Sequence, residues 1–151
     1  MPGGYTIDEA HQLVLTCGWA EVTGEQALWH LRTLAADDRF APDLRQIIDL
    51  RRVTDFDLTC AAVERLAELS PFGCGARRAF VVSTPVIYGL ARMFENLRAR
   101  RGDTFLVSRD MDEVLDWLDL ADARADVLAS LSTIPDMTPE WSARAAAAGA
   151  A

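Results

Sequence analysis

The segment 46–57 constrains the fold more than any other part of the chain, and it reads Gln-Ile-Ile-Asp-Leu-Arg-Arg-Val-Thr-Asp-Phe-Asp. Residues 47–50 form a short apolar run, which is typical of a strand that is buried on both faces beside parallel neighbours. We therefore expect this strand inside a sheet that helices cover. Asp55 or Asp57 is expected to cap the next helix, and α/β sheets usually hold their sites at such strand ends.

Two β-prone runs, at residues 5–8 and 11–17, precede that segment and predict an antiparallel hairpin. Further strands are expected at residues 78–83 and 104–107. Helical spacing of apolar residues predicts helices at residues 23–36, 58–69, 84–101 and 110–118. A chain of 151 residues has the size of one domain. The sequence thus predicts a single α/β domain with a mixed sheet of about five strands, in which helical crossovers follow an opening hairpin.

Local signals place the ends of these helices. Thr23 and Gln26 form a capping box at the first helix, Ser83 or Thr84 begins the third, and Gly102 ends it. The third helix is expected to bury Val86, Leu90, Met93 or Phe94, and Leu97. The basic residues around it are expected to be solvated: Arg77, Arg78, Arg98, Arg100 and Arg101.

The C-terminal part of the sequence differs in composition. An Ala-rich stretch is expected to continue as helix to about residue 131, and Pro135 and Pro139 then interrupt the pattern. Residues 142–151 have no apolar face to bury, which predicts a frayed or disordered end. We therefore expect the folded domain at residues 1–133 and a flexible Pro/Ala-rich tail at residues 134–151.

Charge and composition argue against several classes of function. Fifteen Lys and Arg against 23 Asp and Glu give a net charge of −8, which repels nucleic acids and anionic membrane surfaces. No apolar run approaches the ~20 residues that span a bilayer and no signal segment opens the chain, so a cytosolic protein is expected. Cys17, Cys60 and Cys74 are expected to be buried free thiols.

Catalytic and metal-binding patterns are weak in this sequence. His11 and His30 have no second metal ligand at usable spacing, and His30 is expected to be a partly exposed helix residue. Cys74 has no His nearby to hold its thiolate, and an acid or base role for the aspartates competes with simpler roles in solvation and capping. We therefore expect no enzymatic activity, no metal and no cofactor.

The order of elements and two segments of the chain carry a family resemblance. The segments are Ile47-Ile48-Asp49-Leu50-Arg51-Arg52-Val53-Thr54-Asp55-Phe56-Asp57 and Tyr88-Gly89-Leu90-Ala91-Arg92-Met93-Phe94-Glu95. They resemble the SpoIIAA-like proteins of the STAS/SEC14-like group. The resemblance covers roughly residues 5–120 and implies a STAS-like domain.

The resemblance also bears on regulation by phosphorylation. In the anti-sigma-factor antagonists of this group, a Ser that follows an Asp at the helix start is phosphorylated, and the added charge switches partner binding. Asp57 matches that Asp, whereas Leu58 occupies the position of the Ser. The usual phosphoacceptor is therefore absent. Thr59 is either a displaced phosphoacceptor or a supplementary cap of the helix, and we favour the cap.

The residues and the resemblance together predict a non-enzymatic, cytosolic interaction or regulatory module that forms a homodimer or binds a protein partner. Its binding surface is expected to comprise Asp49, Asp55, Asp57, Thr59, Tyr88 and Arg92. The SEC14-like relatives imply an alternative, in which the chain binds or carries a small apolar ligand or lipid. That alternative requires a cavity lined by residues such as Phe56, Phe94 and Trp117.

Overall fold

A five-stranded sheet forms the centre of the molecule, in the spatial order β1-β2-β3-β4-β5. The computed structural model describes residues 3–150, apart from the side chain of Ala145. Met1, Pro2 and Ala151, which belong to the predicted domain and tail, lie outside the described residues. The strands are β1 (Gly3–Asp8), β2 (Leu13–Thr23), β3 (Arg45–Asp57), β4 (Arg77–Val81) and β5 (Thr104–Ser108).

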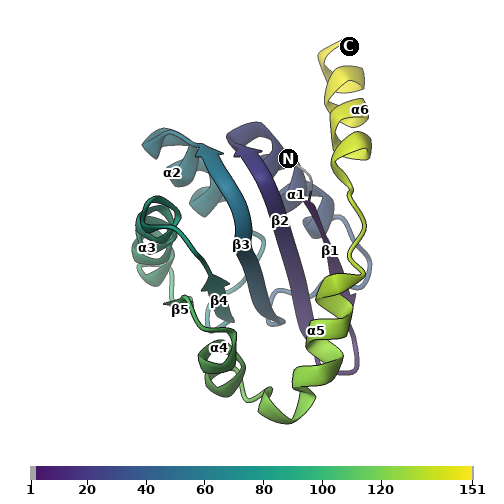
Figure 1. The fold of residues 1–151 in the computed structure, drawn as a ribbon. Helices are drawn as coiled ribbons and strands as arrows, with labels where there is room; N and C mark the ends of the chain where they lie inside the picture. The colour runs from purple at the N-terminus through teal and green to yellow at the C-terminus, as the bar shows by residue number, and fades with distance from the viewer. Residues whose placement is uncertain (1–2, 151) are drawn as a thin grey trace.

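The sheet is mixed, as the sequence predicts. β1 pairs antiparallel with β2, and the pairs β2–β3, β3–β4 and β4–β5 are parallel. A helix joins each parallel pair, because parallel neighbours need a crossover connection. The predicted fold class and the opening hairpin are therefore confirmed (Figure 1).

Helices cover both faces of the sheet. They are α1 (Gly24–Ala35), α2 (Cys60–Leu69), α3 (Pro85–Ala99), α4 (Met111–Trp117), α5 (Arg124–Ser132) and α6 (Thr138–Gly149), with a short 3-10 helix η1 (Ala121–Ala123) before α5. The helices α1, α2 and α3 pack on one face, and α4 and α5 pack on the other. Figure 1 shows α5 in front of the sheet and α1 and α2 behind it. Within residues 3–150, no helix has the length and apolar character needed to cross a membrane.

Two apolar cores lie on the two faces because side chains alternate in direction along each strand. Ile47 and Val81 pack with α4 and α5, in what we call the α4/α5 core. Ile48 and Phe80, each one residue away along its strand, pack with α1, α2 and α3 in the α1–α3 core. The strand predicted at residues 47–50 is thus covered on both sides.

β3 is longer than predicted, and this moves the cap of the next helix. It continues to Asp57 because the end of β2 pairs with it as far as Thr23, which lies opposite Asp57. Asp55 and Asp57 therefore lie within the strand, and the prediction that one of them caps a helix is wrong. Thr59 caps α2, since its hydroxyl oxygen accepts a hydrogen bond of 3.1 Å from the backbone N–H of Ala62.

The predicted ends of α1 and α3 are confirmed. Thr23 Oγ1 accepts from the backbone N–H of Gln26 at 3.3 Å, and the Gln26 side chain accepts from the backbone N–H of Thr23 at 3.1 Å. Thr84 caps α3, and Pro85 follows in the first turn. After the helix, Gly102 has a φ of +89°, a left-handed conformation that glycine adopts at little cost.

The buried stripe of α3 differs from the predicted one. Val86, expected in the core, is 69% exposed. The buried residues are Ile87, Ala91, Phe94 and Arg98. Both sets have helical spacing, but the observed set includes a charged residue, which an apolar pattern leaves out. The prediction that Arg78 and Arg98 are solvated is wrong too, because both are buried and pair with Asp103.

The burial of cysteine and histidine also differs from the prediction. All three cysteines are free, as expected, but Cys60 and Cys74 are exposed and Cys17 is buried. His30 is buried instead of partly exposed, because Trp141 from α6 packs against its ring. Packing between residues so far apart leaves no local pattern in the sequence.

A helix forms in the segment predicted as a tail. Before it, Ile134 is buried and the backbone N–H of Met137 donates to Gly3 O at 2.8 Å. Trp141, near the start of α6, is 1% exposed, whereas the described side chains after it are exposed. Figure 1 shows α6 extending beyond the edge of the sheet. The flexibility of residues 134–151 stays a prediction.

Candidate functional site

A cavity of about 120 Å³ lies within the α1–α3 core, between the sheet and the three helices. Strands and helices all contribute to its apolar wall, which includes Leu31, Ile48, Leu66, Phe80, Ala91 and Phe94. Sites for small ligands are usually concave and mostly apolar, with a few polar groups that orient the ligand. This cavity has that composition, which makes it the candidate site.

Among the described residues, four with polar side chains line the cavity: Thr16, His30, Gln46 and Arg78. Three of them come from the neighbouring strands β2, β3 and β4, and Gln46 lies directly opposite Arg78 in the sheet. Arg78 Nε donates to Gln46 Oε1 at 2.9 Å, and Gln46 Nε2 donates to Thr16 Oγ1 at 3.0 Å. Thr16 Oγ1 in turn lies 3.3 Å from His30 Nε2. A continuous chain of polar groups therefore borders the apolar cavity.

A cluster of buried charges continues this chain beyond Arg78. Arg98 holds the carboxylate of Asp103 with two hydrogen bonds, from Nε at 2.8 Å and from Nη2 at 2.9 Å. Arg78 Nη1 lies 3.3 Å from the same carboxylate and 3.0 Å from Ser70 Oγ. Two guanidinium groups thus share one buried carboxylate. The pKa of Arg78 is lowered to about 9, mainly by burial and to a smaller extent by the charge of Arg98, while Asp103 opposes the shift.

Aromatic rings surround the guanidinium group of Arg78. Its central carbon lies 4.1 Å from the ring centroid of Phe72, 4.7 Å from that of Phe105 and 5.5 Å from that of Phe94. Ring faces attract a cation more strongly when water is excluded, as it is here. The rings therefore help to hold a buried positive charge at the wall of the cavity.

His30 lies between two aromatic rings. Its ring centroid is 5.6 Å from that of Tyr5 and 5.6 Å from that of Trp141, in edge-to-face contacts. Burial, with a smaller contribution from the charge of Arg78, lowers the pKa of His30 to about 4, so the imidazole is neutral at pH 7. Its Nδ1 atom is buried without a hydrogen-bond partner.

The structure places the predicted acidic site residues along and after β3. Asp49 pairs with Arg51 at 2.8 Å, and it points away from the α1–α3 core because its neighbours Ile48 and Leu50 point into that core. Asp55 and Asp57 are exposed near the end of the strand. Thr59, also exposed, caps α2 as described above.

The predicted residues on α3 lie on the other side of the sheet. Tyr88 is half-buried against the α1–α3 core, and the guanidinium group of Arg109 lies 5.4 Å from its ring centroid. Arg92 forms an ion pair with Glu95, at 2.6 Å. Since Asp49 points toward the opposite face, the structure does not bring it into one surface with Tyr88 and Arg92. Their role in binding stays a prediction.

The predicted lining of an apolar cavity is partly correct. Phe56 and Phe94 do line the cavity. Trp117 does not, because it packs against the α4/α5 core on the other face, where Arg77 lies 5.0 Å from its ring centroid. The polar residues of the site were not predicted, although Gln46 and Arg78 each adjoin an apolar run in a predicted strand. In residues 3–150, no group of three or more His, Cys, Asp or Glu side chains is arranged to hold a metal ion.

The sheet order, the opening hairpin and the crossover helices define a SpoIIAA-like fold, which confirms the expectation from the sequence. A crystal structure of an uncharacterised protein of the DUF3478 family with a SpoIIAA-like fold, from Shewanella loihica PV-4, is similar to this chain. The two chains are 17% identical with a TM-score of 0.51, and the alignment covers 77% of this chain and 94% of that one. No protein-family model and no curated protein matches the chain. At this identity the likeness shows the fold alone, so function is argued from the site.

Proposed function

We propose that this chain is a non-enzymatic, cytosolic binding module whose ligand is a small, largely apolar molecule held in the cavity between the sheet and α1, α2 and α3. The cavity itself carries the proposal, because a partly open apolar hollow of about 120 Å³ between a sheet and its helices is the usual form of a small-ligand site. Apolar cavities of ~150 Å³ bind ligands as small as benzene. Burial of such a ligand would recover the contacts that the walls of the cavity otherwise lack.

The chemistry of the lining favours binding over catalysis. Burial raises the pKa of the Cys17 thiol to about 11, so it is protonated at neutral pH and is a poor nucleophile. Its side chain also packs in the α4/α5 core. His30 has its Nε2 atom next to Thr16, and no acid orients its ring among the described hydrogen bonds. A nucleophile, a base and an orienting group are therefore not assembled around the cavity.

A cavity-filling variant tests this proposal. Ala27 lies on α1 and lines the cavity, whereas Ala35 lies on the same helix and is exposed. We expect small apolar probes such as benzene to raise the melting temperature of the native chain and of Ala35→Leu, but not that of Ala27→Leu. Equal shifts in Ala27→Leu and Ala35→Leu would show that the probes bind elsewhere. Absence of any shift in the native chain would also contradict the proposal.

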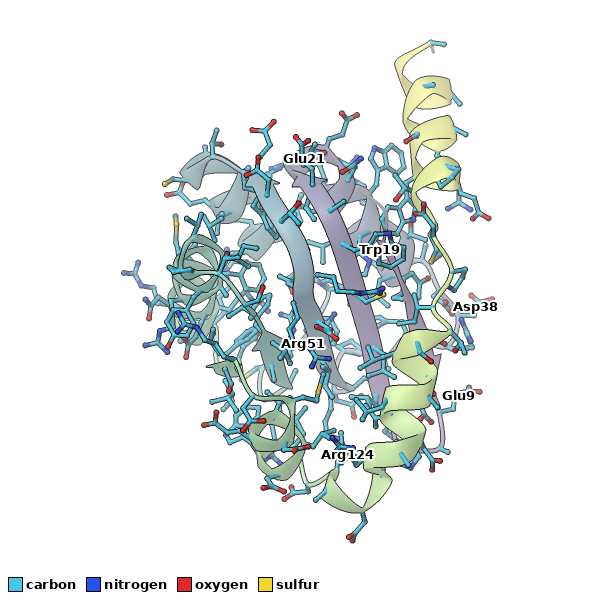
Figure 2. All side chains as sticks on the ribbon, in the orientation of Figure 1. Glu9, Trp19, Glu21, Asp38, Arg51 and Arg124 are labelled. Carbon is cyan, nitrogen blue, oxygen red and sulfur yellow. The ribbon has the colours of Figure 1, made fainter. Side chains whose placement is uncertain are left out.

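A second candidate function is the interaction or regulatory module predicted from the sequence, acting as a homodimer or on a protein partner. The middle of β2 and β3 supports it, because Figure 2 shows Trp19 and Arg51 on a part of the sheet over which no described helix passes. The guanidinium group of Arg52 lies 4.8 Å from the ring centroid of Trp19 there. Trp and Arg side chains are both enriched at protein interfaces.

Native mass spectrometry of the freshly purified chain separates the two candidates. A dimer that dissociates in Trp19→Ala, with no bound small molecule, would favour the interaction module. A monomer with a bound small molecule that leaves on denaturation would favour the cavity.

Tyr88→Ala and Arg92→Ala test the predicted surface on α3, and unchanged binding in both would remove these residues from it. A phosphorylated species in the intact mass, lost in Thr59→Val, would revive the phosphorylation switch.

A further inference from the structure

We propose that the ligand of this cavity is a small monocarboxylic acid, with its carboxylate against Arg78 and its apolar part among the helices α1, α2 and α3. This inference rests on the proposed function, because it names the chemical class of the molecule that the cavity holds. Charge, hydrogen-bonding capacity and volume each support it.

The buried charges beside the cavity do not cancel, because two guanidinium groups share one carboxylate. Arg78 and Arg98 both contact the carboxylate of Asp103, and all three side chains are buried. Arg98 forms two short hydrogen bonds with this carboxylate, whereas Arg78 forms one longer bond. The carboxylate therefore compensates the charge of Arg78 less well than that of Arg98. Of the described residues that line the cavity, Arg78 alone is charged at pH 7. An uncompensated buried charge is costly, and an anion in the cavity would relieve that cost.

The hydrogen bonds along the polar chain show which groups at the wall of the cavity donate and which accept. Arg78 can only donate, so Gln46 presents its carbonyl oxygen to it and turns its amide nitrogen to Thr16. The Thr16 hydroxyl oxygen accepts from Gln46 and lies 3.3 Å from His30 Nε2. His30 Nδ1 is buried and has no hydrogen-bond partner. Arg78 thus contributes a donor-only group to the lining, which suits an acceptor-only carboxylate.

The volume and the walls of the cavity limit the ligand to a short acid. Since an apolar cavity of ~150 Å³ binds benzene, a cavity of about 120 Å³ suits a ligand of about five to eight non-hydrogen atoms. The rest of the lining is apolar, which rejects a second charged group such as that of a dicarboxylate. An acid with a branched chain of about four to six carbon atoms fits both limits.

Calorimetric titration of the full chain at neutral pH tests the inference with three probes of nearly the same shape: 3-methylbutanoate, 3-methylbutanamide and 3-methylbutylamine. We expect the acid to bind at least about tenfold more tightly than the uncharged amide and the cationic amine. Ala27→Leu, which fills the cavity, should abolish binding of the acid, whereas Ala35→Leu should not. Arg78→Gln should reduce the preference for the acid over the amide to less than about threefold.

The outcomes distinguish this inference from the proposed function. Equal affinity for the acid and the amide, lost in Ala27→Leu, would overturn the carboxylate inference and leave apolar binding in place. No binding of any probe would overturn both. A folded Arg78→Gln that keeps the full preference for the acid would also overturn the inference. Should Arg78→Gln fail to fold, the ratio of affinities in the native chain decides alone. Tighter binding of dodecanoate than of 3-methylbutanoate would overturn the limit on size.

Discussion

The single carboxylate of Asp103 balances two guanidinium groups, so its replacement tests the charge cluster directly. In Asp103→Asn the amide cannot neutralise Arg78 or Arg98, and both groups remain buried. Removing one partner of a buried ion pair costs about 3–5 kcal/mol because the other charge stays uncompensated. We expect a loss of this size in the free energy of unfolding, measured by urea denaturation at neutral pH.

An exposed acid provides the matched control for that variant. Glu68 lies 3.9 Å from Arg65 on the surface of α2, and both side chains are more than half exposed. Glu68→Gln is therefore expected to change the free energy of unfolding by less than about 0.5 kcal/mol. Similar small losses in both variants would mean that Asp103 does not balance the buried guanidinium groups as described.

The neutral state of His30 predicts a specific dependence of stability on pH. Burial lowers the pKa of His30 in the folded chain to about 4, whereas an unfolded histidine has a pKa of ~6.5. Between these values the unfolded chain binds the extra proton, so stability falls as the pH decreases from about 6.5 to about 4. The loss from this residue is on the order of 3 kcal/mol.

A variant that cannot titrate at this position isolates the effect. His30→Phe keeps an aromatic ring between Tyr5 and Trp141, and other titrating groups contribute equally to both proteins. Urea denaturation at about pH 7 and at about pH 4 should show a larger loss in the native chain than in His30→Phe. Equal losses would contradict a lowered pKa of His30.

Two glycines at α3 predict stability changes of opposite sign. Gly102 has a φ of +89°, and an added methyl group would overlap with Cys74 Sγ. Gly89 lies inside the helix, where an added methyl group meets no atom within 4 Å. We expect Gly102→Ala to lower the free energy of unfolding by more than about 1 kcal/mol, and Gly89→Ala to raise it by about 0.5–1 kcal/mol. Thermal denaturation of both variants checks the signs, and a more stable Gly102→Ala would refute the described turn.

The order of helices and strands was predictable because each element carries its own local signal. Capping residues such as Thr23 and Thr84 mark helix starts, and the apolar run at residues 47–50 marks a buried strand. The extension of β3 to Asp57 was not predictable in the same way, because it depends on pairing with the far end of β2. Strand length is thus set by the partner as well as by the strand's own residues.

The candidate site was harder to predict because its residues meet only in three dimensions. Phe56 and Phe94 were expected to line a cavity, and they do. The chain of Thr16, Gln46 and Arg78 depends on strand register, which brings together residues that are 30 and 32 positions apart. From the sequence alone, a buried polar residue in a strand cannot be distinguished from a solvated one, because the neighbours that bury it are unknown. The burial of His30 likewise depends on Trp141, far along the chain.

The distribution of charge across the molecule separates its surface from its interior. The chain has a net charge of −8, whereas the buried cluster beside the cavity contains two arginines and one aspartate. Salt screens exposed charges over ~8 Å under physiological conditions, but buried charges are screened much less. The acidic surface therefore reduces non-specific binding of anions, and the local positive charge of Arg78 is the feature on which the proposed selection of a carboxylate depends.

The attachment of α6 to the rest of the molecule depends on one side chain, which gives a final prediction. Trp141 is buried against His30, whereas the described side chains that follow it are exposed. Trp141→Ala should lower the free energy of unfolding by about 3–5 kcal/mol, because it leaves a large void beside α1. Removal of residues 143–151 should change the free energy of unfolding by less than about 0.5 kcal/mol, because every described side chain in this segment is exposed. Urea denaturation distinguishes the two results, and comparable losses would show that α6 is held along its length instead of at Trp141.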